Sequence, residues 1–595
     1  MSTERMGKKR KLSCSFLAVT FVILFVLTTL FWGVSSGWGD VQIKRTYLFA
    51  ENGDKVSVIV YIPETATDEN PAPVVMNFHG RANSAHTLDA WSLEEARRGY
   101  VVINVDRSGA GESVFTNNEA AAVYEYAMTL SFADTEQFMV TGFSSGTTPA
   151  KELADTYDNF KACIQIFPPF VRPEGGAAST NNLLVKAEGD QYNWENVGTL
   201  ADFEAGVPGY MYLDGVDKIE EGKIYGSFED GTADQYVLAK NSLHQTAGVS
   251  SPAIEAMLDF MQQCVDTPNE IPGDNQIYWW AQFLALACCV TMVFFAMALG
   301  ATLLKHPYFA EISQPMPVNN GKRGKALALN ILEAIGIPIL TFIPVSTFGM
   351  DWLSESPLFP AKNFNGIWVW LIFNVIITLI ISAISHVRNV KKGKKYVLSD
   401  YILASEGEKA LNGKRIFKSL LLAGIVAALF YLWLRWIDNF FGIGYQFMTL
   451  AAFTEVSPER LVKSVPYILV LFIVLFVNGI KMNTSRRLAD TDNIRKDMIK
   501  SVTVNALIAG AAVAILLIVN YGSCLLRQGC GVFHFTEGHS SVGSLNFAFA
   551  FPFLMGSMGA LNTYFFRKTG TVWLGAFLTA IIAGITAFVA QPLVM

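Results

Sequence analysis

The chain contains few charged residues and few cysteines for its length. Of its 595 residues, 16% are charged, 51% are hydrophobic and seven are cysteines. No Cys-x-x-Cys pattern is repeated, which excludes a disulfide scaffold and a zinc ribbon. The sequence also lacks an internal repeat, a glycine-serine linker and a low-complexity tract. With a mean hydropathy of +0.33, the chain is too apolar for an ordinary soluble protein, and we predict a membrane protein.

Basic residues are scarce in one part of the chain and abundant in the rest. Residues 40–274 contain 14 Lys and Arg against 36 Asp and Glu, a net charge of -22, and the remainder has a net charge of +16. The formal charge of the whole chain, -6, therefore hides two oppositely charged bodies. This division excludes a single soluble enzyme and a transporter with only short loops. We expect no nucleic-acid partner.

Apolar runs predict nine membrane crossings. The first, 16–32, follows the basic stretch 8–11, so residues 1–37 are interpreted as a cytoplasmic flank and a transmembrane anchor. A cleaved signal peptide is the alternative, and we favour retention. After residue 275, eight further runs are long enough to cross a hydrocarbon core of about 30 Å. These runs cover 277–303, 326–347, 366–387, 416–437, 465–481, 502–522, 545–566 and 572–592.

The loops between these runs predict the orientation of the chain. Basic residues gather at every second connection, in 322–325, 388–395, 486–500 and 567–568. The positive-inside rule places such loops in the cytoplasm. We therefore predict a multi-pass plasma-membrane protein with a cytoplasmic N-terminus, an extracytoplasmic domain over 38–275 and a membrane domain of about eight helices over 276–595.

The predicted membrane domain carries little that points to chemistry. Glu333 lies well inside a predicted crossing, where a carboxylate serves either a function or a structural hydrogen bond. In a later loop, His534, Glu537 and His539 are possible metal ligands, but their spacing fits no strong zinc pattern. We interpret that loop as solvated and expect neither a metal nor another cofactor.

Between residues 41 and 264 short strands alternate with amphipathic helices. Residues 56–61 alternate like an antiparallel strand, and continuous apolar runs follow at 74–78, 101–105, 138–141, 162–167 and 183–187. Continuous runs of this kind are typical of parallel strands that are buried on both faces. The segment therefore predicts an α/β domain with a mostly parallel sheet.

A Gly-x-Ser-x-Gly motif stands between a predicted strand and a predicted helix, as Gly142-Phe143-Ser144-Ser145-Gly146. A nucleophile on a sharp strand-to-helix turn needs neighbours without a Cβ, because the backbone there is strained and closely packed. Ser144 is therefore a candidate nucleophile. A plain glycine-serine turn is the alternative.

With this motif the domain resembles the α/β-hydrolase superfamily. His79-Gly80 follows a strand as that family's oxyanion loop does, and 106–113 is similar to its Asp-x-Arg-Gly-x-Gly-x-Ser turn, with the arginine displaced by one place. The resemblance implies an oxyanion hole made by the backbone N–H groups of Ser145 and of Gly80 or Arg81. It also implies that His79 fixes the loop.

The family order of nucleophile, acid and histidine implies the other two catalytic residues. Within the domain, His244 alone among the histidines follows Ser144 in the sequence. For the acid we favour Asp190, which follows a predicted strand. Asp230 is the rival, although Asp230-Gly231 between two strands is also typical of a hairpin turn.

We therefore expect a membrane-bound serine hydrolase that cleaves an ester, thioester or amide through an acyl-enzyme on Ser144. Its substrate would be a small molecule, a lipid or another acylated compound at the membrane surface. The long insertion 191–222 is a candidate lid. The alternatives are an acyltransferase with the same triad, or a transporter or scaffold whose hydrolase-like domain is a catalytically silent receptor.

Overall fold

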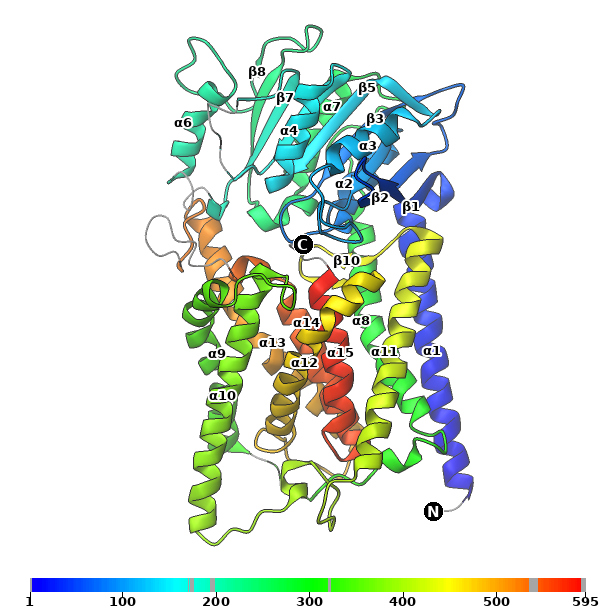
Figure 1. Ribbon diagram of the computed structural model, residues 1–595, viewed down its shortest axis with the longest axis vertical. Helices are drawn as coiled ribbons and strands as arrows, with labels where there is room; N and C mark the ends of the chain where they lie inside the picture. The colour runs from blue at the N-terminus through cyan, green and yellow to red at the C-terminus, as the bar shows by residue number, and fades with distance from the viewer. Residues whose placement is uncertain are drawn as a thin grey trace.

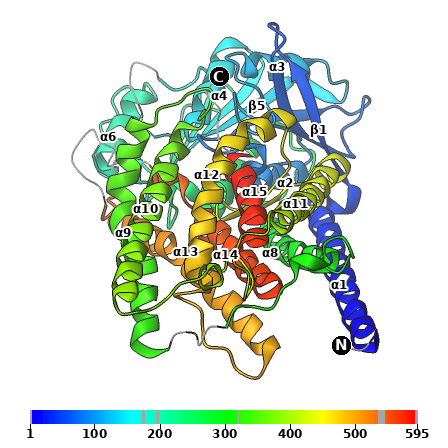
Figure 2. The ribbon, with the colours of Figure 1, turned by 60° about the horizontal axis from the view of Figure 1, so that its bottom comes forward.

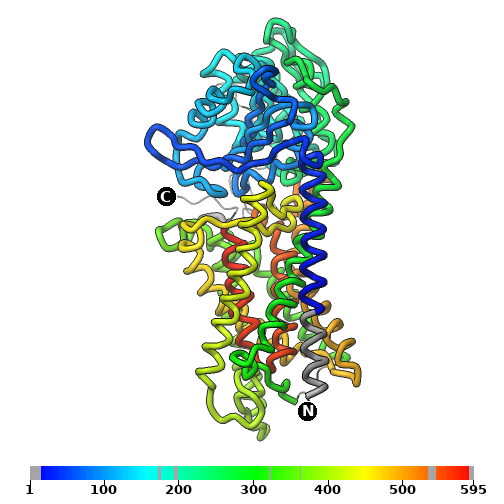
Figure 3. Tube along the Cα trace, turned by 90° about the vertical axis from the view of Figure 1, so that its right-hand side faces the viewer, coloured from blue at the N-terminus to red at the C-terminus, as the bar shows by residue number. Residues whose placement is uncertain are grey.

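The computed structural model describes residues 3–169, 171, 176–192, 198–318, 321, 323–533 and 544–589. An α/β domain, from β1 to α7, packs on one end of a helix bundle formed by α1 and α8–α15 (Figures 1 and 3). The two parts share one continuous cluster of buried apolar side chains, which includes Trp91 of the α/β domain and Tyr278 and Cys288 of the bundle.

The α/β domain is built on a nine-stranded sheet with the order β1-β2-β4-β3-β5-β6-β7-β9-β8. The strands are β1 (Val41–Phe49), β2 (Lys55–Pro63), β3 (Ala72–Phe78), β4 (Val101–Val105), β5 (Ala133–Phe143), β6 (Phe160–Ile166), β7 (Asn181–Ala187), β8 (Ile224–Tyr225) and β9 (Asp234–Ala239). β2 is antiparallel to both β1 and β4, and β8 is antiparallel to β9. All other neighbours are parallel. The predicted mostly parallel α/β sheet is therefore confirmed.

Helices cover both faces of this sheet. They are α2 (Asp89–Arg97), α3 (Glu119–Met128), α4 (Thr147–Thr156), α6 (Leu200–Tyr210) and α7 (Ser251–Cys264). Along β3, Val75 joins the cluster shared with the bundle, whereas Val74 and Met76 join a cluster on the opposite face. Successive side chains of a strand point to opposite faces, and every residue of β3 is buried. The sheet is thus a buried central layer.

The helix bundle contains a helix at each of the nine predicted crossings. These are α1 (Thr3–Ser35), α8 (Tyr278–Leu303), α9 (Gly324–Trp352), α10 (Lys362–Lys391), α11 (Gly413–Phe441), α12 (Pro458–Asn483), α13 (Ile494–Leu526), α14 (Phe551–Thr569) and α15 (Trp573–Val589). Figure 2 shows α9 and α10 on one flank of the bundle and α1 on the other.

Seven of the nine helices, α1 and α8–α13, are long and apolar enough to cross a membrane within the part of the chain that the structure describes. The other two, α14 and α15, are shorter. α15 is apolar but has 17 residues, or about 25 Å at 1.5 Å per residue. α14 has 19 residues, and among them are Asn562 and the pair Arg567-Lys568. Seven of the nine predicted crossings thus coincide with helices long and apolar enough to span a membrane, and the crossings at α14 and α15 stay predictions.

The first helix is an integral part of the bundle. Leu24 and Phe31 are buried in the shared apolar cluster. The hydroxyl of Thr28 forms a hydrogen bond with the hydroxyl of Tyr445, which follows α11. α1 packs along α8, the first helix after the α/β domain. This packing favours retention of α1 over its removal as a signal peptide.

Candidate active site

Ser144 sits on a sharp turn between β5 and α4. Its φ is +52°, in the left-handed region that a residue with a side chain rarely adopts. A Cβ on Gly142 would lie 2.4 Å from the carbonyl oxygen of Gly146, and a Cβ on Gly146 would lie 2.1 Å from that of Phe78. The two glycines therefore let the strand and the helix approach closely enough to hold this strained turn.

Three predicted residues come together at the carboxyl ends of the parallel strands. The Ser144 hydroxyl oxygen lies 2.9 Å from Nε2 of His244. On the other side of the ring, Nδ1 of His244 lies 3.0 Å from Oδ2 of Asp190. His244 opens the turn after β9, and Asp190 follows β7. With exposed fractions of 9%, 4% and 0% for Ser144, His244 and Asp190, the chain of hydrogen bonds is shielded from water.

Asp190 is held by a buried lysine that was not predicted from the sequence. Nζ of Lys186 lies 2.9 Å from Oδ2 of Asp190 and donates to the carbonyl of Pro168 at 2.7 Å. The backbone N–H of Tyr192 donates to Oδ1 at 2.9 Å. Burial alone would raise the pKa of Asp190, but the neighbouring His244 and Lys186 lower it to about 2. Asp190 is therefore a carboxylate at neutral pH.

Asp230, the rival acid, is not brought to His244. It lies in the turn between β8 and β9, where it is exposed. Nδ1 of His244 pairs with Asp190 instead. The Asp-Gly pair is thus part of a hairpin turn.

The loop after β3 is fixed against the nucleophile. A Cβ on Gly80 would lie 3.1 Å from Cβ of Ser144, so this loop passes directly over the serine. Nδ1 of His79 donates to the carbonyl of Gly80 at 2.7 Å, and its Nε2 accepts from the backbone N–H of Arg107 at 3.0 Å. Burial and the charge of Arg107 lower the pKa of His79 to about 4. His79 is therefore neutral and fixes the loop, whereas the oxyanion hole of Ser145, Gly80 and Arg81 stays a prediction.

Arg107, at the displaced position of the family turn, ties three loops together. Its Nη1 donates to the Ser145 hydroxyl at 2.9 Å and to the His79 carbonyl at 3.2 Å. One guanidinium thus contacts both the turn that carries Ser144 and the loop after β3. Although this arginine is displaced by one place in the motif, it can still position these two loops.

Ser144 and His244 open into a cavity whose wall comes largely from the bundle. The bundle contributes mostly apolar residues: Phe364, Gln446, Met448, Thr449, Ala452, Asn546, Phe547, Phe549, Ala550, Phe551, Phe553, Leu554, Thr586 and Ala587. This wall was not predicted from the sequence. The one available signal was the aromatic content of the loops on the predicted outer side.

The predicted lid, 191–222, takes a different position. Of the described residues in this segment, Tyr192 reaches the cavity. The ring of Tyr192 lies edge-on to that of His244, with the two ring centroids 4.5 Å apart. α6 packs instead onto the sheet, where Phe203 and Val207 are buried. Apart from Tyr192, the cover of the cavity is thus supplied by the bundle among the residues that the structure describes.

A polar contact links the bundle to the histidine loop. The side-chain amide of Asn546 donates to the Tyr192 hydroxyl at 3.2 Å, and its oxygen accepts from Gln191 at 3.2 Å and from the Tyr521 hydroxyl. Nε2 of Gln245, next to His244, is 3.4 Å from the same Tyr521 hydroxyl. The position of the bundle loop is therefore coupled to the residues around the imidazole.

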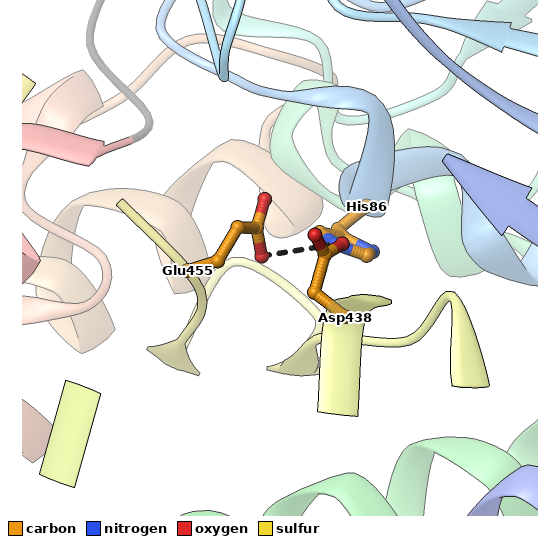
Figure 4. A group of neighbouring side chains, drawn as sticks. All are labelled: His86, Asp438 and Glu455. Atoms are coloured by element: carbon orange, nitrogen blue, oxygen red, sulfur yellow. Dashed lines mark ion pairs between the residues drawn. The ribbon is translucent and has the colours of Figure 1, made fainter. Parts of the chain in front are cut away.

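A buried ion network joins the two parts of the molecule beside this cavity. Arg45 of β1 contacts Asp106 at 2.8 Å within the α/β domain, and Asp438 at 2.8 Å and Glu455 at 2.5 Å in the bundle. Figure 4 shows His86, Asp438 and Glu455, with the imidazole 3.4 Å from Glu455.

These three side chains have the donor types of a metal site, and their donor atoms lie within 4.8 Å of one another. The guanidinium of Arg45, however, contacts all three groups, including Nε2 of His86 at 3.2 Å. The guanidinium group of Arg45 thus occupies the position that a bound cation would need. The cluster fits an ion-paired interface. The other candidate metal ligands, His534, Glu537 and His539, lie outside the described residues.

Comparisons with known proteins found similarity to this chain only among solved structures. No protein-family model and no curated protein matches it. Among solved structures, similar chains are a bacterial heroin esterase (15% identity, 38% of this chain and 86% of that chain, TM-score 0.28) and a dienelactone-hydrolase-like promiscuous phosphotriesterase from metagenomic libraries (15%, 42% and 98%, TM-score 0.26). The chain spans 43% of a hypothetical protein from Pseudomonas aeruginosa (17% identity, 21% of this chain, TM-score 0.20). The strand order and parallel neighbours define an α/β-hydrolase-like domain, which is joined here to a bundle of candidate membrane helices.

Proposed function

We propose that the protein is a membrane-embedded serine hydrolase that forms an acyl-enzyme on Ser144. His244 would take the proton of the hydroxyl as Ser144 attacks the carbonyl carbon, and would return it to the leaving group. Asp190 would hold the imidazole in its productive tautomer and stabilise its protonated form. The observation that carries this proposal is the hydrogen-bond chain of 2.9 and 3.0 Å from Ser144 through His244 to Asp190. No cofactor enters the scheme.

The bundle wall supports a substrate with an apolar part. Aromatic and aliphatic side chains such as Phe551, Phe553 and Leu554 face the same cavity as Ser144. Each buried methylene group of a ligand contributes roughly 0.8 kcal/mol to its binding. We therefore propose that the ester, thioester or amide belongs to a lipid or another acylated molecule, which the enzyme takes from the bilayer surface.

We propose that the α/β domain is extracytoplasmic and that the N-terminus is cytoplasmic, in the plasma membrane. The basic segments 388–395 and 486–500 adjoin the ends of α10, α12 and α13. In Figure 1 the connections at the lower end of the bundle lie opposite the α/β domain. The positive-inside rule supports a cytoplasmic location for these connections.

A fluorophosphonate probe that cannot cross membranes tests activity and orientation together. It should label the protein on intact cells, and Ser144→Ala should abolish the labelling. Ser131→Ala is the matched control, because Ser131 is on the same domain and its hydroxyl contacts the exposed Asp68. Labelling that survives in Ser144→Ala would refute the nucleophile. Labelling that needs permeabilised cells would refute the orientation.

An acyltransferase is the second candidate, favoured by one observation. Ser144 is 9% exposed and faces a mostly apolar wall, which limits access of water to an acyl-enzyme. Turnover of an acyl ester with and without an added alcohol or amine separates the two activities. Acyl transfer to the acceptor identifies a transferase, and free acid in both reactions identifies a hydrolase. A folded protein inert to probe and ester would instead support the silent-receptor alternative.

A further inference from the structure

A second cavity lies inside the bundle between α9, α10, α12, α13 and α14. Part of its wall is polar and includes Asn330, Glu333, Asn374, Lys481 and Arg486. The remainder is apolar. A cavity with a polar and an apolar part matches the two ends of an amphiphile.

The polar part carries an excess positive charge. Nζ of Lys481 pairs with Glu333 at 3.2 Å, and Glu333 also interacts electrostatically with Arg486, so a single carboxylate faces two cations. Arg486 is 8% exposed, and its side chain forms no hydrogen bond or ion pair with any residue that the structure describes. A buried charge without a partner is costly. An anion in the cavity would supply the missing partner.

The apolar part leads towards the Ser144 cavity along two helices. On α14, Phe551 lines the Ser144 cavity, and Met555, Met558 and Asn562 line the second one. Their spacings of four, three and four residues place all four on one helix face. Leu554 and Met555 are direct neighbours in the sequence, and each lines a different cavity.

The same arrangement recurs on α10. Phe364 lines the Ser144 cavity, and Leu371 and Thr378 line the second cavity. Steps of seven residues keep the three positions on nearly the same face of the helix. The two cavities thus follow one another along common faces of α10 and α14.

We propose that the second cavity binds an amphiphile whose anionic head, a carboxylate or a phosphate, pairs with Arg486. Its hydrocarbon chain lies along α10 and α14 towards the Ser144 cavity. Glu333 and Lys481 form the neutral pair that borders the headgroup site, and this gives the intramembrane carboxylate a role. The inference does not require Ser144 to be a nucleophile.

Binding to the full-length protein in phosphatidylcholine nanodiscs tests the site. The probes are palmitate, hexadecyl phosphate, inorganic phosphate and uncharged hexadecanol. Wild type should bind an anionic amphiphile, and Arg486→Gln should weaken that binding about tenfold or more, because a charge-assisted hydrogen bond is lost. Hexadecanol binding should not depend on Arg486. The comparison of palmitate with hexadecyl phosphate identifies the preferred head, and inorganic phosphate shows whether the chain is needed.

Arg495→Gln is the matched control, because Arg495 carries the same charge in the same basic segment but is exposed. Its binding of the anionic probes should equal that of wild type. A palmitate analogue with a diazirine on its chain should cross-link to α10 or α14. Anionic binding by Arg486→Gln within twofold of wild type, or cross-links confined to other helices, would overturn the proposal.

Two further measurements separate binding from folding and from catalysis. Without a probe, the thermal midpoint of Arg486→Gln should equal or exceed that of wild type, because a buried unpaired charge is removed. A lower midpoint would overturn the proposal, since it would show a structural role. Palmitate binding should persist in Ser144→Ala, so a failure of the serine chemistry leaves this result unchanged.

Discussion

Replacement of Arg45 by methionine tests whether the ion network holds the α/β domain on the bundle. The Arg45 side chain is 3% exposed, and it contacts Asp106, Asp438 and Glu455. Methionine fills similar space without the charge, so three buried carboxylates lose their main partner. Removal of one partner from a buried ion pair costs about 3–5 kcal/mol. We expect a destabilisation of at least that size.

The destabilisation should also affect the candidate active site, because the network adjoins the cavity wall. Glu455 follows β11 (Ala451–Phe453), and Ala452 of that strand lines the Ser144 cavity. Arg45→Met should therefore lower both the thermal midpoint and the rate at which a fluorophosphonate labels Ser144. Both quantities are measured on the full-length protein in the same detergent.

The matched control is Lys55→Met, which removes another ion pair between the two parts. Nζ of Lys55 lies 3.9 Å from Glu459, whose side chain is 61% exposed. Such a pair contributes about 0–1 kcal/mol. A triple variant with Asp438→Asn and Glu455→Gln added to Arg45→Met should recover part of the lost stability. If Arg45→Met behaves like Lys55→Met, the network does not hold the interface.

Two predictions concern the acid of the triad. Asp190→Asn should lower the labelling rate of Ser144 by roughly 10³ to 10⁴, because His244 loses its orienting carboxylate; a rate within tenfold of wild type would contradict this role. Lys186→Met should raise the pKa of Asp190 from about 2, so the loss of stability on acidification, measured as the thermal midpoint from pH 2 to 6, should begin at higher pH. Because the pKa of Asp190 is lower in the folded state than in the unfolded state, its contribution to stability, at most about 2.5 kcal/mol, is present above roughly pH 4 and is lost as the pH falls towards 2. That contribution should shrink in Lys186→Met, and an unchanged dependence of the thermal midpoint on pH would refute the pairing.

The buried strands could be predicted from the sequence because both of their faces are covered. All residues of β3 and β4 are buried, so each strand appears as a continuous apolar run. β1 was missed, because Arg45 stands at a buried position of the strand and interrupts its alternating pattern. Arg45 is nevertheless buried, since its partners Asp438 and Glu455 come from a part of the chain about 400 residues away. No local pattern could indicate that pairing.

The candidate site divides in the same way. The Ser144 turn was predictable because its strain and its two glycines are local properties of five residues. Chain order then indicated His244 and Asp190. Lys186 was not singled out, because a lysine within a strand gives no sign of its burial. The cavity wall was missed because it gathers segments such as 446–452 and 546–554, which meet only in the folded protein.

The pairing of α1 with α8 affects how the protein is made. The two helices are separated by about 240 residues, and the whole α/β domain is inserted between them. At typical synthesis rates of about 5–20 residues per second, α8 is synthesised roughly 10–50 seconds after α1. The hydrogen bond between the hydroxyls of Thr28 and Tyr445 forms later still, because Tyr445 follows α8 in the sequence. If the α/β domain folds during this interval, it brings the ends of α1 and α8 together before the later helices of the bundle are made.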